Sequence, residues 1–292
     1  MDDNKLYNAL LKSQQQRKEG KYGDGEANPD DQFRKERPFA GERLQPPNWT
    51  RVETETDGYP PSVYDSSVSL GLISNPRPWT KAELRARKIV FPGMADKAVL
   101  DAYREIRIQL RNNANNRPSF TVLYSCIGKS ECPVRTAFNL AAAFASDSGT
   151  SALLVDCDPH NSGLSELVSV PMDEGVTDYI LDPKLPIKKI IYPSGVDRLS
   201  VIPAGNHPAS AVELFSSIRM RDLIEELEGR YPDRCIIINS PPFQESTEAR
   251  ILERFSDQVI LGVPFGRLTE DEILESVESF DATKFSGLVF QE

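Results

Sequence analysis

The sequence predicts an α/β protein with a doubly wound, mostly parallel sheet, preceded by a long and largely irregular N-terminal extension. From residue 99 onward, near-continuous apolar runs alternate with amphipathic helical patterns. This alternation is typical of parallel strands with helices on both faces of the sheet. Before residue 95 the chain is polar and rich in proline, so it has little to bury. We therefore expect two regions, residues 1–95 and residues 96–292.

The extension is predicted to bind a partner rather than to form a core of its own. A short helix is expected at residues 4–12, where three apolar side chains form a small stripe. Residues 13–65 offer almost nothing to bury and should be extended or disordered when free. The run SVSLGLI at residues 68–74 is a second apolar cluster. Short apolar clusters within polar, proline-rich sequence are typical of segments that become ordered on binding.

The second region begins with a helical pattern, LDAYREIRIQLR, with apolar residues on one side and arginines on the other. Strands are predicted at residues 120–125, 151–156, 199–204, 235–239, 258–264 and 286–290. Helices are predicted at residues 134–146, 211–230, 247–255 and 269–280. Two of these helices should begin with capping boxes, Ser210 with Glu213 and Thr269 with Glu272.

Composition excludes several classes of function. The net charge of −10 argues against a broad nucleic-acid surface. The four cysteines form no C-x-x-C pair and there are only two histidines, so no metal site is expected. The start of the sequence is not a signal peptide, and no apolar run is long enough to span a membrane. We therefore expect a cytoplasmic protein.

Chemistry is expected at the carboxyl ends of the strands, because parallel sheets bind ligands there. Three strand ends carry polar motifs. The first strand runs into SCIGKSECPVRT at residues 125–136, the second ends in DCDPH at residues 156–160, and the fourth ends in NSPP at residues 239–242.

At these motifs the chain resembles the cytoplasmic ATPase domain of bacterial polysaccharide-biosynthesis tyrosine autokinases (BY-kinases), which are related to the ParA/MinD group of P-loop ATPases. The resemblance covers residues from about 99 to 292. It rests on several blocks in the family's order: DAYREIRIQL, TAFNLAAAFA, LLVDCDPHNSGLSEL, GVTDYILD, RLSVIPAG and IIINSPPFQESTEARILERFSDQVILGV. It implies a P-loop NTPase-like fold for this region.

The family's phosphate loop, P-G-E-G-K-[ST]-T-T, is degenerate in this chain. Counting back without gaps from the N-L-A block at residues 139–141, the family lysine falls on Pro133 and the glycine before it on Cys132. The hydroxyl that ligates Mg²⁺ falls on Val134. These family residues hold the phosphates and the cation, so the resemblance implies a site that binds ATP weakly or not at all.

Gly128, Lys129 and Ser130 spell G-K-S four positions earlier than the family motif. Leu123 stands where the upstream glycine of a phosphate loop would be required. Two interpretations stay open. Lys129 is an ordinary solvated lysine, or the loop rearranges and brings its ammonium group to a phosphate.

The remaining acidic positions are only partly preserved. Asp156 and Asp158 match the family's D-x-D-x-R motif, with His160 in place of the arginine. The family aspartates serve Mg²⁺ and the attacking hydroxyl, whereas here they could equally cap the following turn. Asn239 stands where the family has an aspartate that holds Mg²⁺ through water, and a neutral amide is a poor ligand for a hard cation.

Assembly features of the family are preserved in part. Its members oligomerise through E-x-x-R-x-x-R, which Asp101, Arg104 and Arg107 match with aspartate for glutamate. The alternative is a solvated helix face. The family's tyrosine-rich tail has no counterpart in the printed sequence, which has no tyrosine after Tyr231. We therefore expect no phosphorylation of such a tail.

The resemblance and its departures together predict a non-catalytic regulatory or scaffolding subunit, a pseudo-kinase, of a bacterial exopolysaccharide synthesis and export complex. The expected partner is a membrane-embedded polysaccharide co-polymerase, which would place the protein at the inner membrane. No cofactor is expected, and ATP with Mg²⁺ would bind only if the phosphate loop rearranges. One alternative is a divergent ATPase or tyrosine autokinase that uses Lys129, Asp156 and Asp158 to control chain length. The other is a ParA/MinD-like positioning ATPase.

Overall fold

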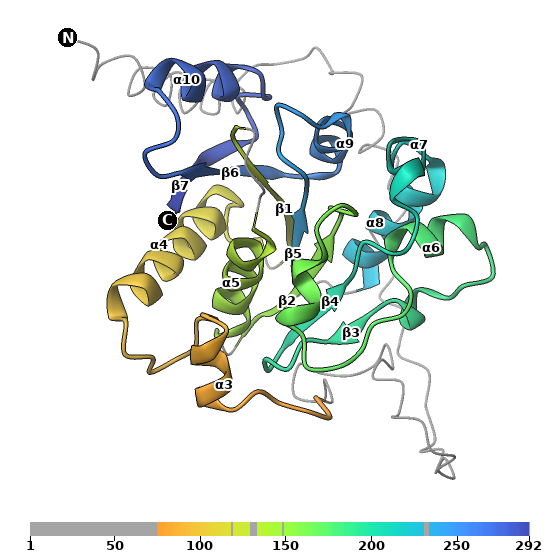
Figure 1. Cartoon of the computed structure of the whole chain (residues 1–292), viewed down its shortest axis with the longest axis horizontal. Helices are drawn as coiled ribbons and strands as arrows, with labels where there is room; N and C mark the ends of the chain where they lie inside the picture. The colour runs from red at the N-terminus through yellow and green to blue at the C-terminus, as the bar shows by residue number, and fades with distance from the viewer. Residues whose placement is uncertain (1–74, 118, 129–132, 148, 231–233, 292) are drawn as a thin grey trace.

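The computed structural model describes residues 75–292 except residues 118, 129–132, 148, 231–233 and 292. The predicted helix at residues 4–12 and the apolar run at residues 68–74 lie outside the described residues. The described part of the chain forms the α/β domain drawn in colour in Figure 1.

A seven-stranded sheet with the order β3-β4-β2-β5-β1-β6-β7 organises the domain. All neighbouring strands are parallel except the short edge pair β3 and β4, which is antiparallel. The strands are β1 (Phe120–Cys126), β2 (Ser151–Asp156), β3 (Tyr192–Pro193), β4 (Leu199–Ile202), β5 (Arg234–Asn239), β6 (Gln258–Pro264) and β7 (Phe285–Gln291). The predicted doubly wound, mostly parallel sheet is confirmed.

Helices cover both faces of this sheet. They are α3 (Lys81–Ala86), α4 (Lys97–Asn113), α5 (Val134–Ala145), α6 (Val176–Leu181), α7 (Ala211–Phe215), α8 (Ile218–Arg230), α9 (Thr247–Leu252) and α10 (Glu270–Glu278). Successive residues of β1 alternate between two buried clusters. Val122 and Tyr124 belong to the cluster with α3, α4 and α5, and Leu123 belongs to the cluster with α6 to α10. This period of two explains why the strand sequences are apolar without a break.

The six predicted strands and the helix patterns have counterparts, with some corrections. The helix predicted at residues 211–230 is two helices, because α7 ends at Phe215 and the hydroxyl of Ser217 accepts from the amide of Met220 as α8 begins. The capping box predicted at Ser210 is wrong, since Ser210 is the last residue of a 3₁₀ turn and its side chain makes no capping bond. The capping box at Thr269 and Glu272 is confirmed.

The packed domain extends further toward the N-terminus than residue 96. Ile89 and Val90 are buried in the α5 side of the core, and Leu84 of α3 joins them. The side chain of Asn139 on α5 holds this segment at two points. It accepts from the amide of Val90 at 3.0 Å and donates to the carbonyl of Lys88 at 3.0 Å. We call residues 77–91 the strap. The structure thus places the strap against the core, whereas the sequence assigned it to the extension.

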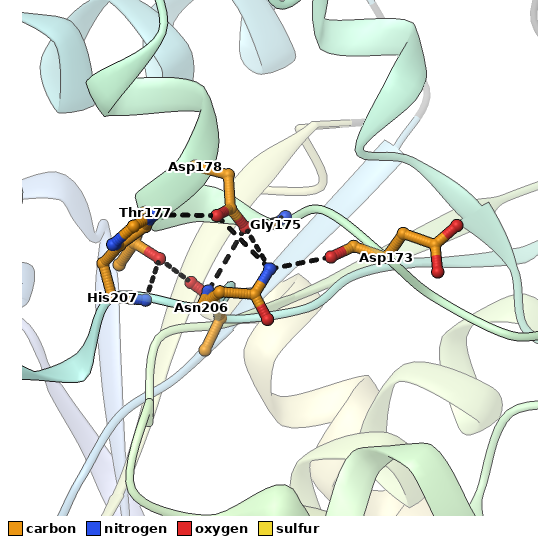
Figure 2. Close-up of polar contacts among 7 residues, drawn as sticks. Asp173, Gly175, Thr177, Asp178, Asn206 and His207 are labelled. Atoms are coloured by element: carbon orange, nitrogen blue, oxygen red, sulfur yellow. Dashed lines mark hydrogen bonds and ion pairs between the residues drawn. The ribbon is translucent and has the colours of Figure 1, made fainter.

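A polar network that the sequence did not predict holds α6 against the end of β4 (Figure 2). The carboxylate of Asp178 accepts from the amide of Gly175 at 2.8 Å and from the amide of Asn206 at 3.2 Å. It also lies 3.3 Å from Nε2 of His207. The hydroxyl of Thr177 accepts from the amide of His207 and donates to the carbonyl of Ala204. The GVTDYILD block therefore has a structural role, because it fixes α6 to the segment that follows β4.

Candidate functional site

The polar motifs at the ends of β2 and β5 come together. The two strands are neighbours, and Asp156 pairs directly with Asn239 in their register. The side-chain amide of Asn239 donates to Oδ1 of Asp156 at 2.8 Å. Both side chains are almost completely buried. The sequence placed both residues at the same edge of the sheet, but it did not show that they bond to each other.

Burial dominates the electrostatics of this pair. Desolvation raises the pKa of Asp156 to about 7, although hydrogen bonds from Asn239 and from the amide of Asp158 oppose the shift. No cationic side chain is among the causes of this shift. In the described part of the chain, Oδ1 of Asn239 has no hydrogen-bond partner. The side-chain amide of Asn239 is thus a hydrogen-bond donor to the buried Asp156 carboxyl.

Asp158 takes part in a tight turn after β2. Its amide donates to Oδ1 of Asp156 at 3.1 Å, and its own Oδ1 accepts from the amide of His160 at 3.2 Å. Desolvation raises the pKa of Asp158, and repulsion from Glu248 adds to the rise. Through these bonds both aspartates cap the turn that follows β2, which is one of the two roles expected for them.

Pro133 and Val134, which the gapless count assigned to the family's phosphate loop, lie at the N-terminus of α5. Pro133 is the N-cap and makes no side-chain capping bond. It also has no amide proton to offer an anion. Val134 is buried in the apolar cluster on the α5 side of the sheet. The amide of Gly128 donates to Oε1 of Gln244 at 3.1 Å. Lys129 and Ser130 lie outside the described residues, so their proposed role stays a prediction.

A cavity of about 590 Å³ opens beside this helix N-terminus. The 3₁₀ turn η2 (Ser162–Glu166) and the segment after β6 form its other walls. It is lined by Pro133, Val134, Arg135, Asn161, Gly163, Glu166, Leu167, Pro264, Phe265, Arg267 and Gln291. Within the described residues, no group of three or more His, Cys, Asp or Glu side chains could hold a metal ion.

Most residues around this cavity were not predicted from sequence. Gln291 is an example, because its Oε1 accepts from the hydroxyls of Thr136 at 2.7 Å and Tyr124 at 3.0 Å. Its amide donates to Sγ of Cys126. These partners are more than 150 positions away along the chain, and only the order of strands in the sheet brings them together. No local pattern signals such a contact.

The predicted oligomerisation residues have different environments. Arg104 forms an exposed ion pair with Asp101 at 3.0 Å. Arg107 instead donates to the carbonyl of Ala143 near the end of α5 at 2.9 Å. Desolvation lowers the pKa of Arg107. Arg107 is therefore engaged within the chain, and Asp101 and Arg104 are the two that remain at the surface of α4.

No protein-family model matches the chain. Curated relatives do match. The chain is 29% identical over 186 residues to the tyrosine-protein kinase wzc of Salmonella typhi, covering 62% of this chain and 25% of that protein. It is 28% identical over 185 residues to the tyrosine-protein kinase CpsD of Streptococcus agalactiae, covering 62% of this chain and 76% of that protein. The chain is a homologue of bacterial tyrosine-protein kinases.

Solved structures agree with this homology at the level of fold. The kinase domain of the Escherichia coli tyrosine kinase ETK superposes with a TM-score of 0.58 at 21% identity, covering 74% of this chain and 88% of that domain. The chimerical protein CapA2B2 superposes with a TM-score of 0.60 at 22% identity, covering 73% and 91%. The resemblance to BY-kinases and the P-loop NTPase-like fold are thus confirmed. In the described residues, no helix is long and apolar enough to cross a membrane.

Proposed function

We propose that this homologue of tyrosine kinases is a non-catalytic regulatory or scaffolding subunit of a bacterial exopolysaccharide synthesis and export complex. The observation that carries the proposal is the chemistry at three positions. A proline, a buried valine and a buried asparagine occupy the places of the family's lysine, Mg²⁺-binding hydroxyl and Mg²⁺-binding aspartate.

The expected effect on nucleotide binding is large. Three lost charge-assisted contacts, at roughly 1.5–3 kcal/mol each, lower affinity by at least about 10³-fold. Phosphoryl transfer suffers further, because its transition state depends on positioned positive charge. Val134 cannot regain the role by a rotamer change, since it has no oxygen and its side chain packs in the core.

The state of Asp156 supports the same proposal. Asp156 is buried, and its Oδ1 already accepts from the Asn239 amide at 2.8 Å and from the amide of Asp158 at 3.1 Å. Its surroundings favour a buried structural role over cation binding.

Binding would then be the chain's means of influence. The proposed partner is a membrane-embedded polysaccharide co-polymerase that holds the protein at the cytoplasmic side of the inner membrane. The extension is the proposed contact, and the exposed pair of Asp101 and Arg104 is the proposed contact between copies. ATP with Mg²⁺ is not expected to be a cofactor.

One observation favours the enzyme alternative: a cavity remains at the N-terminus of α5, and Asp156 and Asp158 are present at neighbouring positions. Incubation of the purified full chain with Mg²⁺ and radiolabelled ATP separates the two proposals. A scaffold incorporates no label on tyrosine. Labelling that disappears in the variant Lys129→Ala would establish the divergent autokinase, in which the loop rearranges to deliver Lys129.

A further inference from the structure

The strap contacts one wall of the cavity. It lies on the same side as α4 and α5 (Figure 1), and the side chain of Trp79 is partly buried there. The indole Nε1 of Trp79 donates to the carbonyl of Leu167 at 3.0 Å. Leu167 follows η2 directly and lines the cavity. One residue of the strap is thus bonded to the cavity's wall.

A second strap residue holds the neighbouring position of the same wall. The guanidinium of Arg87 lies 3.8 Å from the centre of the Trp79 ring, and its Nε donates to the carbonyl of Glu166 at 3.0 Å. Glu166 also lines the cavity. A cation stacked on an indole ring orients both groups. Arg87 and Trp79 therefore form one unit that binds two consecutive carbonyls of the wall.

The other end of this unit is fixed to the domain. The amide of Trp79 donates to the carbonyl of Gly195 at 2.8 Å. Gly195 has φ +96°, and a Cβ atom there would lie 2.6 Å from Cδ1 of Trp79. Only glycine allows the indole ring to approach so closely. Trp79 is thus seated in a position shaped for it, between the β3–β4 connection and η2.

The strap is also bonded to the middle of α5, the helix whose first residues form the opposite wall. Asn139 of α5 holds the backbone at Lys88 and Val90 through both ends of its amide. On the cavity side, η2 packs closely on α5, because a Cβ atom at Gly163 would lie 3.3 Å from Cγ1 of Val134. The two walls are therefore held together by direct packing inside and by the strap outside.

We propose that the strap is a relay between the N-terminal extension and the cavity, with Trp79 and Arg87 as its positioning residues. Release of the strap from η2 loosens the wall at residues 163–167, and a strap in place keeps that wall closed on α5. A partner that binds the extension can thereby act on the cavity, because the extension continues directly into the strap. The relay works whether or not the cavity takes a nucleotide.

Hydrogen–deuterium exchange on the full chain tests the relay. The reporters are the amides of Leu167, bonded to the Leu164 carbonyl, and Ser169, bonded to the Ser194 carbonyl. We expect exchange at both to be at least tenfold faster in Trp79→Ala and several-fold faster in Arg87→Ala. Arg85→Ala is the matched control, since Arg85 is an exposed cation in α3, the helix whose C-cap is Arg87, and it should leave both amides unchanged.

Two further readouts separate a relay from general loss of structure. Amides of β5 should exchange at the wild-type rate in all variants, and the methyl signals of Leu167 and Val134 should shift in Trp79→Ala and Arg87→Ala only. If Trp79→Ala fails to fold, the exchange rates measured in Arg87→Ala alone test the relay. Unchanged exchange at Leu167 and Ser169 in a folded Arg87→Ala, or equal acceleration in β5, would overturn the relay.

Discussion

The buried carboxyl of Asp156 leads to a prediction about stability. Its pKa of about 7 in the folded protein compares with an ordinary value near 3.8. The folded state therefore binds more protons than the unfolded state between these values, and stability falls as pH rises through this window. Each pKa unit corresponds to roughly 1.4 kcal/mol. The full penalty is on the order of 4 kcal/mol above pH ~7 and is absent below pH ~4.

The variant Asp156→Asn removes this penalty while keeping the shape of the side chain. An amide oxygen at this position can still accept from Nδ2 of Asn239 and from the amide of Asp158, the two bonds that Asp156 Oδ1 accepts now. Those bonds weaken when the acceptor is neutral. We therefore expect a net gain of roughly 2–3 kcal/mol in the free energy of unfolding at pH 8, and little change at pH 4.5.

Urea unfolding followed by circular dichroism at pH 8 and pH 4.5 measures both values. Asp222→Asn is the matched control, because Asp222 is exposed, and it should change neither. Destabilisation of Asp156→Asn at pH 8 would refute the reasoning. It would mean that the folded protein favours the charged carboxylate, as expected for an aspartate that binds a cation.

Four further predictions concern assembly and folding. Arg104→Glu should shift the protein toward smaller species in light scattering if the ion pair with Asp101 marks a subunit contact; an unchanged mass would leave it as a solvated face. Deletion of residues 1–74 should leave a folded domain that no longer co-purifies with the membrane complex, and retained binding would argue against the extension as the contact. Deletion of residues 1–90 should also cost about 3–5 kcal/mol of unfolding free energy, because it removes buried strap side chains; equal stability of the two truncations would contradict this packing. Asp178→Ala should lower the free energy of unfolding by about 2–3 kcal/mol, because it leaves two backbone donors unpaired. His207→Ala removes only a half-exposed partner and should lower it by less than about 1 kcal/mol. Equal losses would show that the histidine dominates the network.

The central strands could be predicted because each is an apolar run bounded by polar residues, and their alternation with helices fixes the fold class. The strap could not be predicted in this way. Apart from Leu84, its buried residues form the short run Ile89, Val90 and Phe91 within proline-rich sequence. This run is held in the core by Asn139 on α5, some 50 positions further along the chain.

The candidate site could also be predicted only in part. The positions of Asp156 and Asn239 followed from the sequence, since both residues end strands and the carboxyl ends of neighbouring parallel strands share one edge of the sheet. Their mutual bond, the turn role of Asp158 and the contact of Arg107 with the Ala143 carbonyl depend on distances between elements. The three-residue spacing suggested that Arg107 shares one helix face with Arg104. Each step of three residues turns the helix by about 300°, which is less than a full turn, so Arg107 faces α5 instead.

Isothermal titration calorimetry of the purified full chain with ATP and Mg²⁺ measures directly whether the site binds nucleotide. We expect no saturable heat up to about 1 mM ATP, because Pro133, Val134 and Asn239 stand at the lysine, hydroxyl and aspartate positions. Saturable binding in the low micromolar range that is lost when Mg²⁺ is removed would contradict it.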